Sequence, residues 1–198
     1  NATINAGNDP DLGLDLLNIE DDGSNPIGPD LRPDNGRDTV SGGEGDDVIF
    51  GADDDDELFG DEGDDTIDGE IDDDLVDGGV GDDSLRGGQG DDTVVGGDGQ
   101  DTIDGGIGAD DLSGGADEDL FINVNAGDTV DGGSEVTTGT DFDTLDLRGS
   151  APTGGSLTVE ITGPDSNGNG FDGVVNFFDE DGNDAGSLTF TEIEDIIP

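Results

Sequence analysis

Apolar residues recur at a fixed interval of nine through the middle of the chain. Between residues 33 and 131 the recurring position is always aliphatic or Phe, and the residues around it are mostly Gly, Asp and other polar types. These apolar residues are Val40, Ile49, Leu58, Ile67, Val76, Leu85, Val94, Ile103, Leu112, Phe121 and Val130. A fixed period of this kind indicates stacked structural repeats, in which each unit contributes one side chain to a continuous core.

Each repeat has a second constant position, an aspartate two residues before the apolar one. When each unit is numbered from its first residue, as in residues 42–50, the aspartate stands at position six and the apolar residue at position eight. The aspartates are Asp38, Asp47, Asp56, Asp65, Asp74, Asp83, Asp92, Asp101, Asp110, Asp119 and Asp128. The outer units 33–41 and 123–131 lose the opening glycines, and we interpret them as degenerate terminal repeats.

Glycine at the first four positions predicts the local conformation. Glycine reaches positive φ and lets backbone carbonyls come close together, so we expect the first six positions to form a turn. The last three positions are expected to form a short strand with position eight pointing inward. Position four is Gly in most units, but it is Asp54, Asp72, Asp117 and Ala126 in others. If this position needs positive φ, Asp is tolerated and Ala is not.

The pattern resembles the RTX (repeats-in-toxin) or hemolysin-type calcium-binding nonapeptides, which read GGxGxDxUx with U apolar. The resemblance covers about half of the chain. It implies an all-β fold, a right-handed parallel β-roll in which two units make one coil and turns line both edges. It also implies Ca²⁺ between the turns of units n and n+2, held by both position-six aspartates and by turn carbonyls. Oxygen-only coordination suits a hard cation of this size.

This scheme divides the aspartates into two columns, one on each edge of the roll. Column one contains Asp47, Asp65, Asp83, Asp101 and Asp119. Column two contains Asp38, Asp56, Asp74, Asp92, Asp110 and Asp128. We predict several calcium ions, with a regular row along column one, weaker or differently coordinated sites at Asp56 and Asp74, and an end of the second row near Ala126.

The resemblance also implies ligands from the turn backbone. In column one these residues are Gly42, Gly43, Glu44, Gly45, Gly60, Glu62, Gly63, Gly78, Val80, Gly81, Gly96, Gly97, Asp98 and Gly99. In column two they are Gly87, Gly88, Gln89, Gly90, Gly105, Ile107 and Gly108.

Composition narrows the function classes. The chain has 198 residues with 55 acidic and four basic ones, a formal net charge of -51, which favours a cation as the partner. Nucleic acid is excluded as a partner because it needs basic patches, and membrane insertion because no apolar run approaches about 20 residues. The chain has no His and no Cys, which excludes the usual nucleophile systems and zinc sites, so we expect no enzyme activity.

A disordered acidic polymer is the alternative to a folded roll. Such a polymer would not keep an apolar residue at position eight of every unit. Without calcium, however, that description becomes the expected one, because metal binding supplies the folding free energy that a thin core cannot.

The segments outside the repeats divide the chain further. We expect an N-terminal cap at 1–32 with a Leu-rich strand at 12–19, the roll at 33–131, an expanded last coil at 132–150 and an antiparallel β cap at 151–198. In the last coil Asp143 and Leu145 take positions six and eight. The cap has predicted turns at 163–170 and 179–186. In the first turn Asp165, Asn167 and Asn169 match the opening of an EF-hand loop, but Asn176 replaces its final Glu, so a polar turn is favoured and ion binding there stays open.

The C-terminal stretch 173–198 also resembles the segment that precedes Hint-type autoprocessing domains in some secreted RTX proteins. Taken together, these features predict a secreted calcium-binding β-roll protein with a structural role, as an extracellular matrix, adhesin or cell-surface filament subunit. It would fold on calcium after type I export and form a homopolymer by end-to-end stacking. The alternative is a calcium-dependent repeat region of a larger exoenzyme or toxin. Ice binding by Thr ranks is disfavoured, because Thr stands at position seven only in scattered units.

Overall fold

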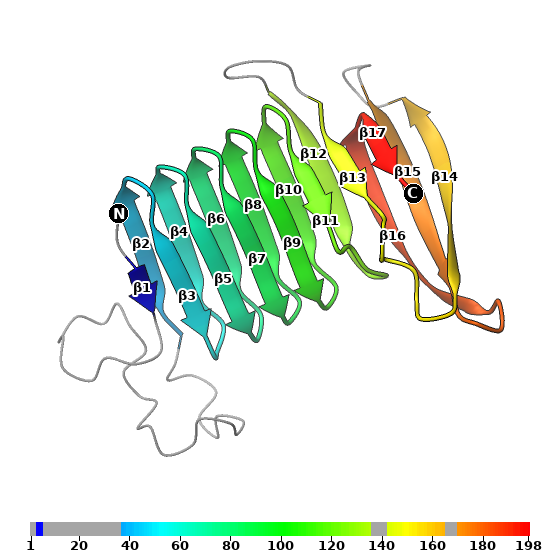
Figure 1. Cartoon of the computed structure of the whole chain (residues 1–198), viewed down its shortest axis with the longest axis horizontal. Helices are drawn as coiled ribbons and strands as arrows, with labels where there is room; N and C mark the ends of the chain where they lie inside the picture. Colours follow the sequence, from blue (N-terminus) through cyan, green and yellow to red (C-terminus); the bar gives the residue numbers. More distant parts are fainter. Residues whose placement is uncertain (1–2, 6–36, 136–141, 165–169) are drawn as a thin grey trace.

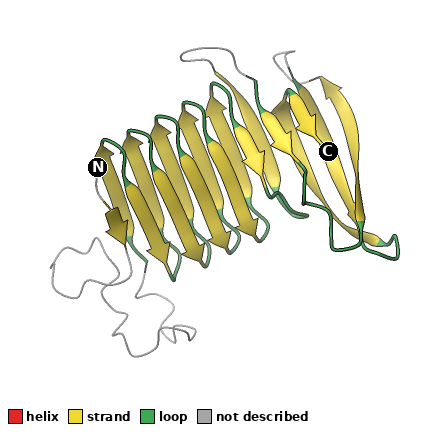
Figure 2. Cartoon of the chain, viewed as in Figure 1, coloured by secondary structure: helices red, strands yellow, loops and turns green. Residues whose placement is uncertain are grey.

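The computed structural model describes residues 3–5, 37–135, 142–164 and 170–198. Over these residues the protein is all-β, and no helix long and apolar enough to cross a membrane occurs among them (Figures 1 and 2). The chain forms a parallel β-solenoid of about five turns that ends in antiparallel strands, so the predicted fold class is confirmed.

Two sheets make up the solenoid, and the chain alternates between them from β2 to β13 (Figure 1). The first sheet contains, in spatial order, β1 (Thr3–Asn5), β3 (Val48–Ala52), β5 (Thr66–Ile71), β7 (Ser84–Gln89), β9 (Thr102–Ile107), β11 (Leu120–Ile122), β13 (Thr144–Asp146) and β17 (Asp195–Ile197). The second contains β2 (Thr39–Glu44), β4 (Glu57–Glu62), β6 (Leu75–Val80), β8 (Thr93–Asp98), β10 (Asp111–Ala116), β12 (Thr129–Glu135), β16 (Asp184–Ile193), β15 (Phe171–Phe178) and β14 (Ser156–Pro164).

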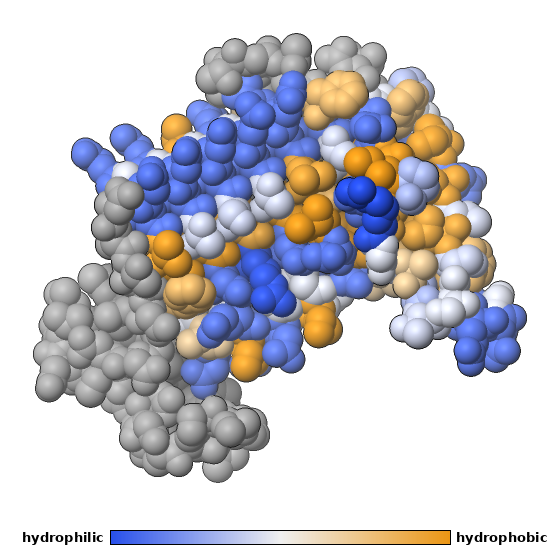
Figure 3. Space-filling view, in the orientation of Figure 1, coloured by the Kyte–Doolittle hydropathy of each residue, from blue (hydrophilic) through white to orange (hydrophobic). Residues whose placement is uncertain are grey.

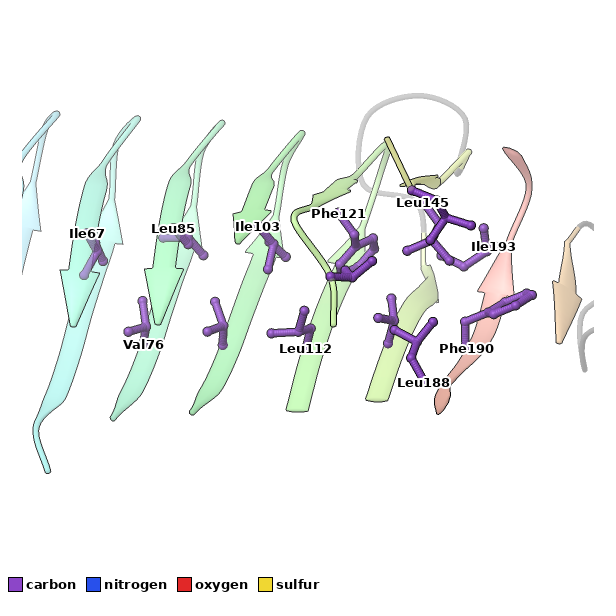
Figure 4. Packing of buried hydrophobic residues seen from close by; sticks show 14 of the residues in the cluster. Ile67, Val76, Leu85, Ile103, Leu112, Phe121, Leu145, Leu188, Phe190 and Ile193 are labelled. Carbon is purple, nitrogen blue, oxygen red and sulfur yellow. The ribbon is translucent and has the colours of Figure 1, made fainter. Parts of the chain in front are cut away.

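In the roll the core consists of two facing rows of position-eight side chains, one from each sheet, and residues of the C-terminal strands continue it. Parallel pairing places Ile67 beside Leu85 and Val76 beside Val94, so each core residue stacks on its counterpart in the next coil (Figure 4). All eleven position-eight residues are at most 3% exposed. The predicted register is therefore confirmed. Ser84, next to Leu85, is exposed on the outer face, as a period of two along a strand requires.

The strands are longer than the sequence pattern predicts. The prediction of a turn over positions one to six is wrong. The strand continues through the first three positions of the next unit, as in β5, and the turn occupies positions four to six. Backbone pairing between coils extends across the glycines and up to position three. The N–H group of Gly63 at position four, for example, donates to the carbonyl of Val80 at position three of the next coil, at 2.8 Å.

Position four adopts positive φ in every unit from 42 to 122, as expected. The three aspartates that replace glycine have φ of 76° (Asp54), 78° (Asp72) and 82° (Asp117). At Ala126 the turn changes, and the positive φ moves to Gly127. Position two shares the left-handed conformation, with φ of 99° at Ala52, although the sequence pattern does not predict it.

The C-terminal strands continue the solenoid. Strand β13 pairs with β11 and places Leu145 beside Phe121, so Leu145 takes the position-eight role as predicted. Strand β15 pairs antiparallel with β14 on one side and with β16 on the other, and β16 also runs parallel to β12 with Phe190 beside Val130. The turn predicted at 179–186 is shorter, since only residues 179–183 lie between β15 and β16, and the N–H group of Gly182 donates there to the carbonyl of Asp179.

Three expectations concern residues outside the described part of the chain. These are the Leu-rich strand at 12–19, most of the turn at 163–170, and the Asp165, Asn167 and Asn169 set. In the N-terminal segment the structure describes β1, which pairs with β3 at the edge of the first sheet.

Candidate calcium sites

The position-six aspartates form two hydrogen-bonded ladders along the solenoid. The backbone N–H of each aspartate donates to the Oδ1 of the aspartate 18 residues later, as from Asp47 to Asp65 (2.7 Å) and from Asp56 to Asp74 (2.8 Å). In column one the ladder joins Asp47, Asp65, Asp83, Asp101 and Asp119. In column two it joins Asp38, Asp56, Asp74, Asp92, Asp110 and Asp128. The geometry therefore brings the predicted residues together in the predicted columns.

The second oxygen of these carboxylates is buried inside the turn. The Oδ2 atoms of Asp38, Asp56, Asp65, Asp74, Asp83, Asp92, Asp101 and Asp110 lie out of contact with solvent and have no hydrogen-bond partner. The side chains themselves are at most 5% exposed. A buried carboxylate oxygen without a partner is costly, and a bound ion is one of the partners that can satisfy it.

Glycine at position one makes room for these oxygens. A Cβ atom at Gly60 would overlap both the Oδ2 of Asp65 and the carbonyl oxygen of Gly78 in the next coil. The same pair of oxygens faces Gly78, where they come from Asp83 and Gly96. Each turn thus keeps a small cradle lined by a carboxylate and a carbonyl, which any side chain at position one would fill.

Further carbonyls point into the space between coils. A Cβ atom at Gly81, position four, would overlap the carbonyl of Gly63, and one at Gly79, position two, would overlap the carbonyl of Asp61. No three Asp, Glu, His or Cys side chains of the described residues group together as a metal site would require. Each step has two aspartates instead, and carbonyls would have to complete a shell of about six to eight oxygens. This donor set fits Ca²⁺.

Burial and mutual repulsion perturb the ladder carboxylates. Burial raises the pKa of Asp56 and Asp74 to about 8 and that of Asp83 to about 7, and neighbouring carboxylates add to each rise. The N–H group of the preceding aspartate opposes the rise by its hydrogen bond. The two highest values occur in column two, where Asp54 and Asp72 bring further negative charge. A cation between the coils would relieve this repulsion.

Two further ladders at position five, one on each edge, were not foreseen from the sequence. The N–H of Asp82 donates to Oδ1 of Asp64 (3.1 Å), and that of Gln100 donates to Oδ1 of Asp82 (3.0 Å). These exposed carboxylates point toward the next coil, whereas the position-six carboxylates point toward the previous one. The available signal was Asp at position five in six consecutive units, from Asp46 to Asp91.

The two columns end differently. In column one the N–H of Asp119 donates to Oδ1 of Asp143 at 2.9 Å, so the ladder crosses the expanded coil and Asp143 takes the position-six role as predicted. In column two Asp128 is the last member, and its Oδ2 accepts from the N–H of Asn125 at 2.6 Å. The second row of carboxylate oxygens therefore ends at a backbone N–H group of the same chain.

The surface reflects the composition. Hydrophilic residues dominate along the upper edge of the roll, whereas hydrophobic residues lie among them along its lower edge and are more frequent over the C-terminal strands (Figure 3). Two of the described arginines form ion pairs with aspartates of adjacent coils, Arg37 with Asp55 (2.5 Å) and Arg86 with Asp68 (3.3 Å). These exposed pairs offset a very small part of the net charge of -51.

A parallel solenoid with oxygen-lined turns at both edges defines the class of protein, a β-roll with repeats of the calcium-binding type. A family model described as the RTX calcium-binding nonapeptide repeat, in four copies, matches residues 34–67, 50–85 and 86–121. Residues 34–121 therefore consist of repeats of the RTX calcium-binding type, as the resemblance in the sequence predicts. The comparison with curated proteins gives no match.

Proposed function

We propose that this protein is a secreted structural β-roll that folds when calcium binds along both of its edges. The position-six aspartates and the carbonyls of positions one to four would be the ligands. The observation that carries the proposal is the repeated cradle, in which a buried Oδ2 and a carbonyl of the next coil face the same glycine. Bound Ca²⁺ would compensate the negative charge of these buried carboxylates.

Charge supports a coupling between calcium and folding. A chain of net charge -51 repels itself, and each repeat contributes only one side chain to the hydrophobic core, so the core alone offers little to oppose this repulsion. The free energy of calcium binding would therefore supply the free energy of folding. Cytosolic calcium would be too scarce to fold the chain, which would stay extended for type I export, and millimolar extracellular calcium would match the weaker affinities of extracellular modules.

The ends of the solenoid support a structural role in an assembly. Strand β2 at one end and β14 at the other each have a single neighbour among the described strands. Such edges can pair with another chain, so end-to-end stacking would build a filament, a matrix or an adhesive layer. Analytical ultracentrifugation in calcium tests this step, because a protein that stays monomeric at every concentration contradicts assembly.

The family match is limited to residues 34–121, so the repeats also suit the calcium-dependent region of a larger secreted enzyme or toxin. The mass of the native secreted species separates the two functions. Repeats continuous with a catalytic domain would favour the second function and contradict the first.

Far-ultraviolet circular dichroism tests calcium-dependent folding. We expect coil in chelator, cooperative formation of β-structure with Ca²⁺, and little response to Mg²⁺ at equal concentration, because Mg²⁺ demands a near-octahedral shell and dehydrates reluctantly. Full β-structure in excess chelator at neutral pH would contradict the proposal.

A further inference from the structure

The carboxylate ladder of column one continues beyond the repeats into the C-terminal segment. The N–H of Asp143 donates to Oε2 of Glu194 at 2.8 Å, which repeats the relation between successive position-six aspartates. Pairing of β13 with β17 places Thr144 beside Asp195, so Glu194 precedes its strand as each position-six aspartate does. Figure 1 shows β17 beside β13. Glu194 therefore occupies the position-six place of one more coil, although no repeat motif marks it.

The cradle is repeated at the same step. A Cβ atom at Gly132 would overlap the Oδ2 of Asp143 and the carbonyl of Glu192. At Gly114, one coil earlier, the corresponding atoms are the Oδ2 of Asp119 and the carbonyl of Gly132. The carbonyl of Glu192 thus replaces that of a position-one glycine. Both oxygens of the repeat cradle are present where the sequence has left the repeat.

The last coil is shorter than a repeat. Residues 192–197 supply positions one and six to nine, and only Ile193, the last residue of β16, lies between Glu192 and Glu194. The shorter turn leaves the backbone with less reach. The side chain of Glu compensates, because it is one methylene longer than that of Asp. In column two the matching place is Leu188, because Thr129 pairs with Thr189. Only column one, therefore, meets a carboxylate in the C-terminal strands.

We propose that Asp143 and Glu194, with the carbonyl of Glu192, form a terminal calcium site that fastens β17 to the roll. This inference rests on the proposed function of the repeats. Strand β17 has three residues and one described neighbour, held by bonds such as that from the N–H of Leu147 to the carbonyl of Ile197 (2.7 Å). So short an edge strand gains little from pairing alone, and a shared ion makes its docking depend on calcium.

The test uses Glu194→Gln in the full chain. Glutamine keeps an oxygen that can accept from the N–H of Asp143, but it removes the negative charge and the second carboxylate oxygen that strengthen calcium binding. Glu160→Gln, on the exposed face of β14, is the matched control for loss of one negative charge. Bound calcium is counted by equilibrium dialysis with metal analysis, and amide hydrogen exchange is followed at 195–197 and across β5 to β9.

We expect Glu194→Gln to bind one calcium ion fewer than the wild type and to lose protection at 195–197, while β5 to β9 stay protected. Unchanged stoichiometry and protection, equal to those of Glu160→Gln, would overturn the inference. A role in hydrogen bonding alone predicts that Glu194→Gln keeps the ion and the protection and that Glu194→Ala loses only the protection. Calcium-independent protection of β5 to β9 in the wild type would instead refute the proposed function itself.

Discussion

The two edges of this roll are built from one motif, yet they differ in regularity and in extent. Column one has glycine at position four from Gly45 to Gly99 and its ladder reaches Glu194. Column two has Asp54 and Asp72 at position four and ends at Asp128. The aspartate at position six is constant in both. The difference indicates that position six is needed for its carboxylate, whereas position four is needed for its positive φ, which Asp can adopt as well as Gly.

Extra carboxylates crowd the part of column two around Asp56 and Asp74. Burial and neighbouring carboxylates raise the pKa of these two aspartates to about 8, whereas the pKa of Asp92, further along the same column, is raised to about 6. Burial is the first cause in all three, and Asp54 or Asp72 adds repulsion at the first two. Column one instead joins the repeats to the C-terminal strands. The following predictions test this contrast.

A core substitution should destabilise both aspartate columns together, so that the difference between the two edges disappears. Leu85 is 2% exposed and stacks between Ile67 and Ile103, so Leu85→Asp would bury a charge without a partner and cost several kcal/mol. Ser84→Asp, on the exposed face, is the control and should cost less than about 1 kcal/mol. Thermal unfolding in calcium measures both, and equal losses would mean that the register is wrong.

Acidity should act in opposite directions with and without calcium. In chelator, carboxylates with raised pKa bind more protons in the folded state than in the unfolded state, so stability rises as pH falls from about 8 toward 4. Calcium competes with protons for the same oxygens, so its stabilisation weakens over that window. Circular dichroism from pH 8 to pH 5 should show β-structure growing in chelator and unfolding midpoints falling in calcium. Parallel trends would contradict the account.

Single ligand substitutions should separate the columns. Asp83→Asn weakens two steps of column one and Asp74→Asn two steps of column two, each at about 1 to 3 kcal/mol in calcium. In chelator above pH 8, where Asp74 is ionised, Asp74→Asn should raise the content of β-structure, because it removes a charge that Asp92 and Asp72 repel. Calcium titrations followed by circular dichroism measure both variants. Destabilisation by Asp74→Asn in chelator above pH 8 would show that repulsion does not dominate column two.

The smallest effect is expected at position four. Asp72 has φ of 78° and Gly81 has φ of 141°. Asp72→Gly should therefore change stability by less than about 1 kcal/mol, whereas Gly81→Asp should cost about 1 to 3 kcal/mol, because its Cβ would overlap the carbonyl of Gly63. Chemical denaturation in calcium compares the pair. Equal costs for the two variants would mean that position four does not control the turn.

Much of the fold was predictable from the sequence, because each unit repeats one chemical choice at position six and one at position eight. Asp65 and Ile67 are where the period places them, and Asp143 was found by the same pattern after an insertion. Position two escaped notice because its positive φ is set by pairing between coils and is filled by residues as different as Gly and Ala52. Glu194 escaped because its place depends on how the C-terminal strands fold back onto the roll.

The central claim is that calcium lies between the position-six aspartates in two columns of unequal length. Anomalous diffraction from crystals grown in calcium locates the ions directly. We predict an unbroken row of peaks from Asp47 through Asp143 to Glu194, and a second row that is irregular near Asp56 and Asp74 and ends before Asp128. Equal and fully regular rows on both edges, or an absence of peaks between the aspartates, would contradict the account.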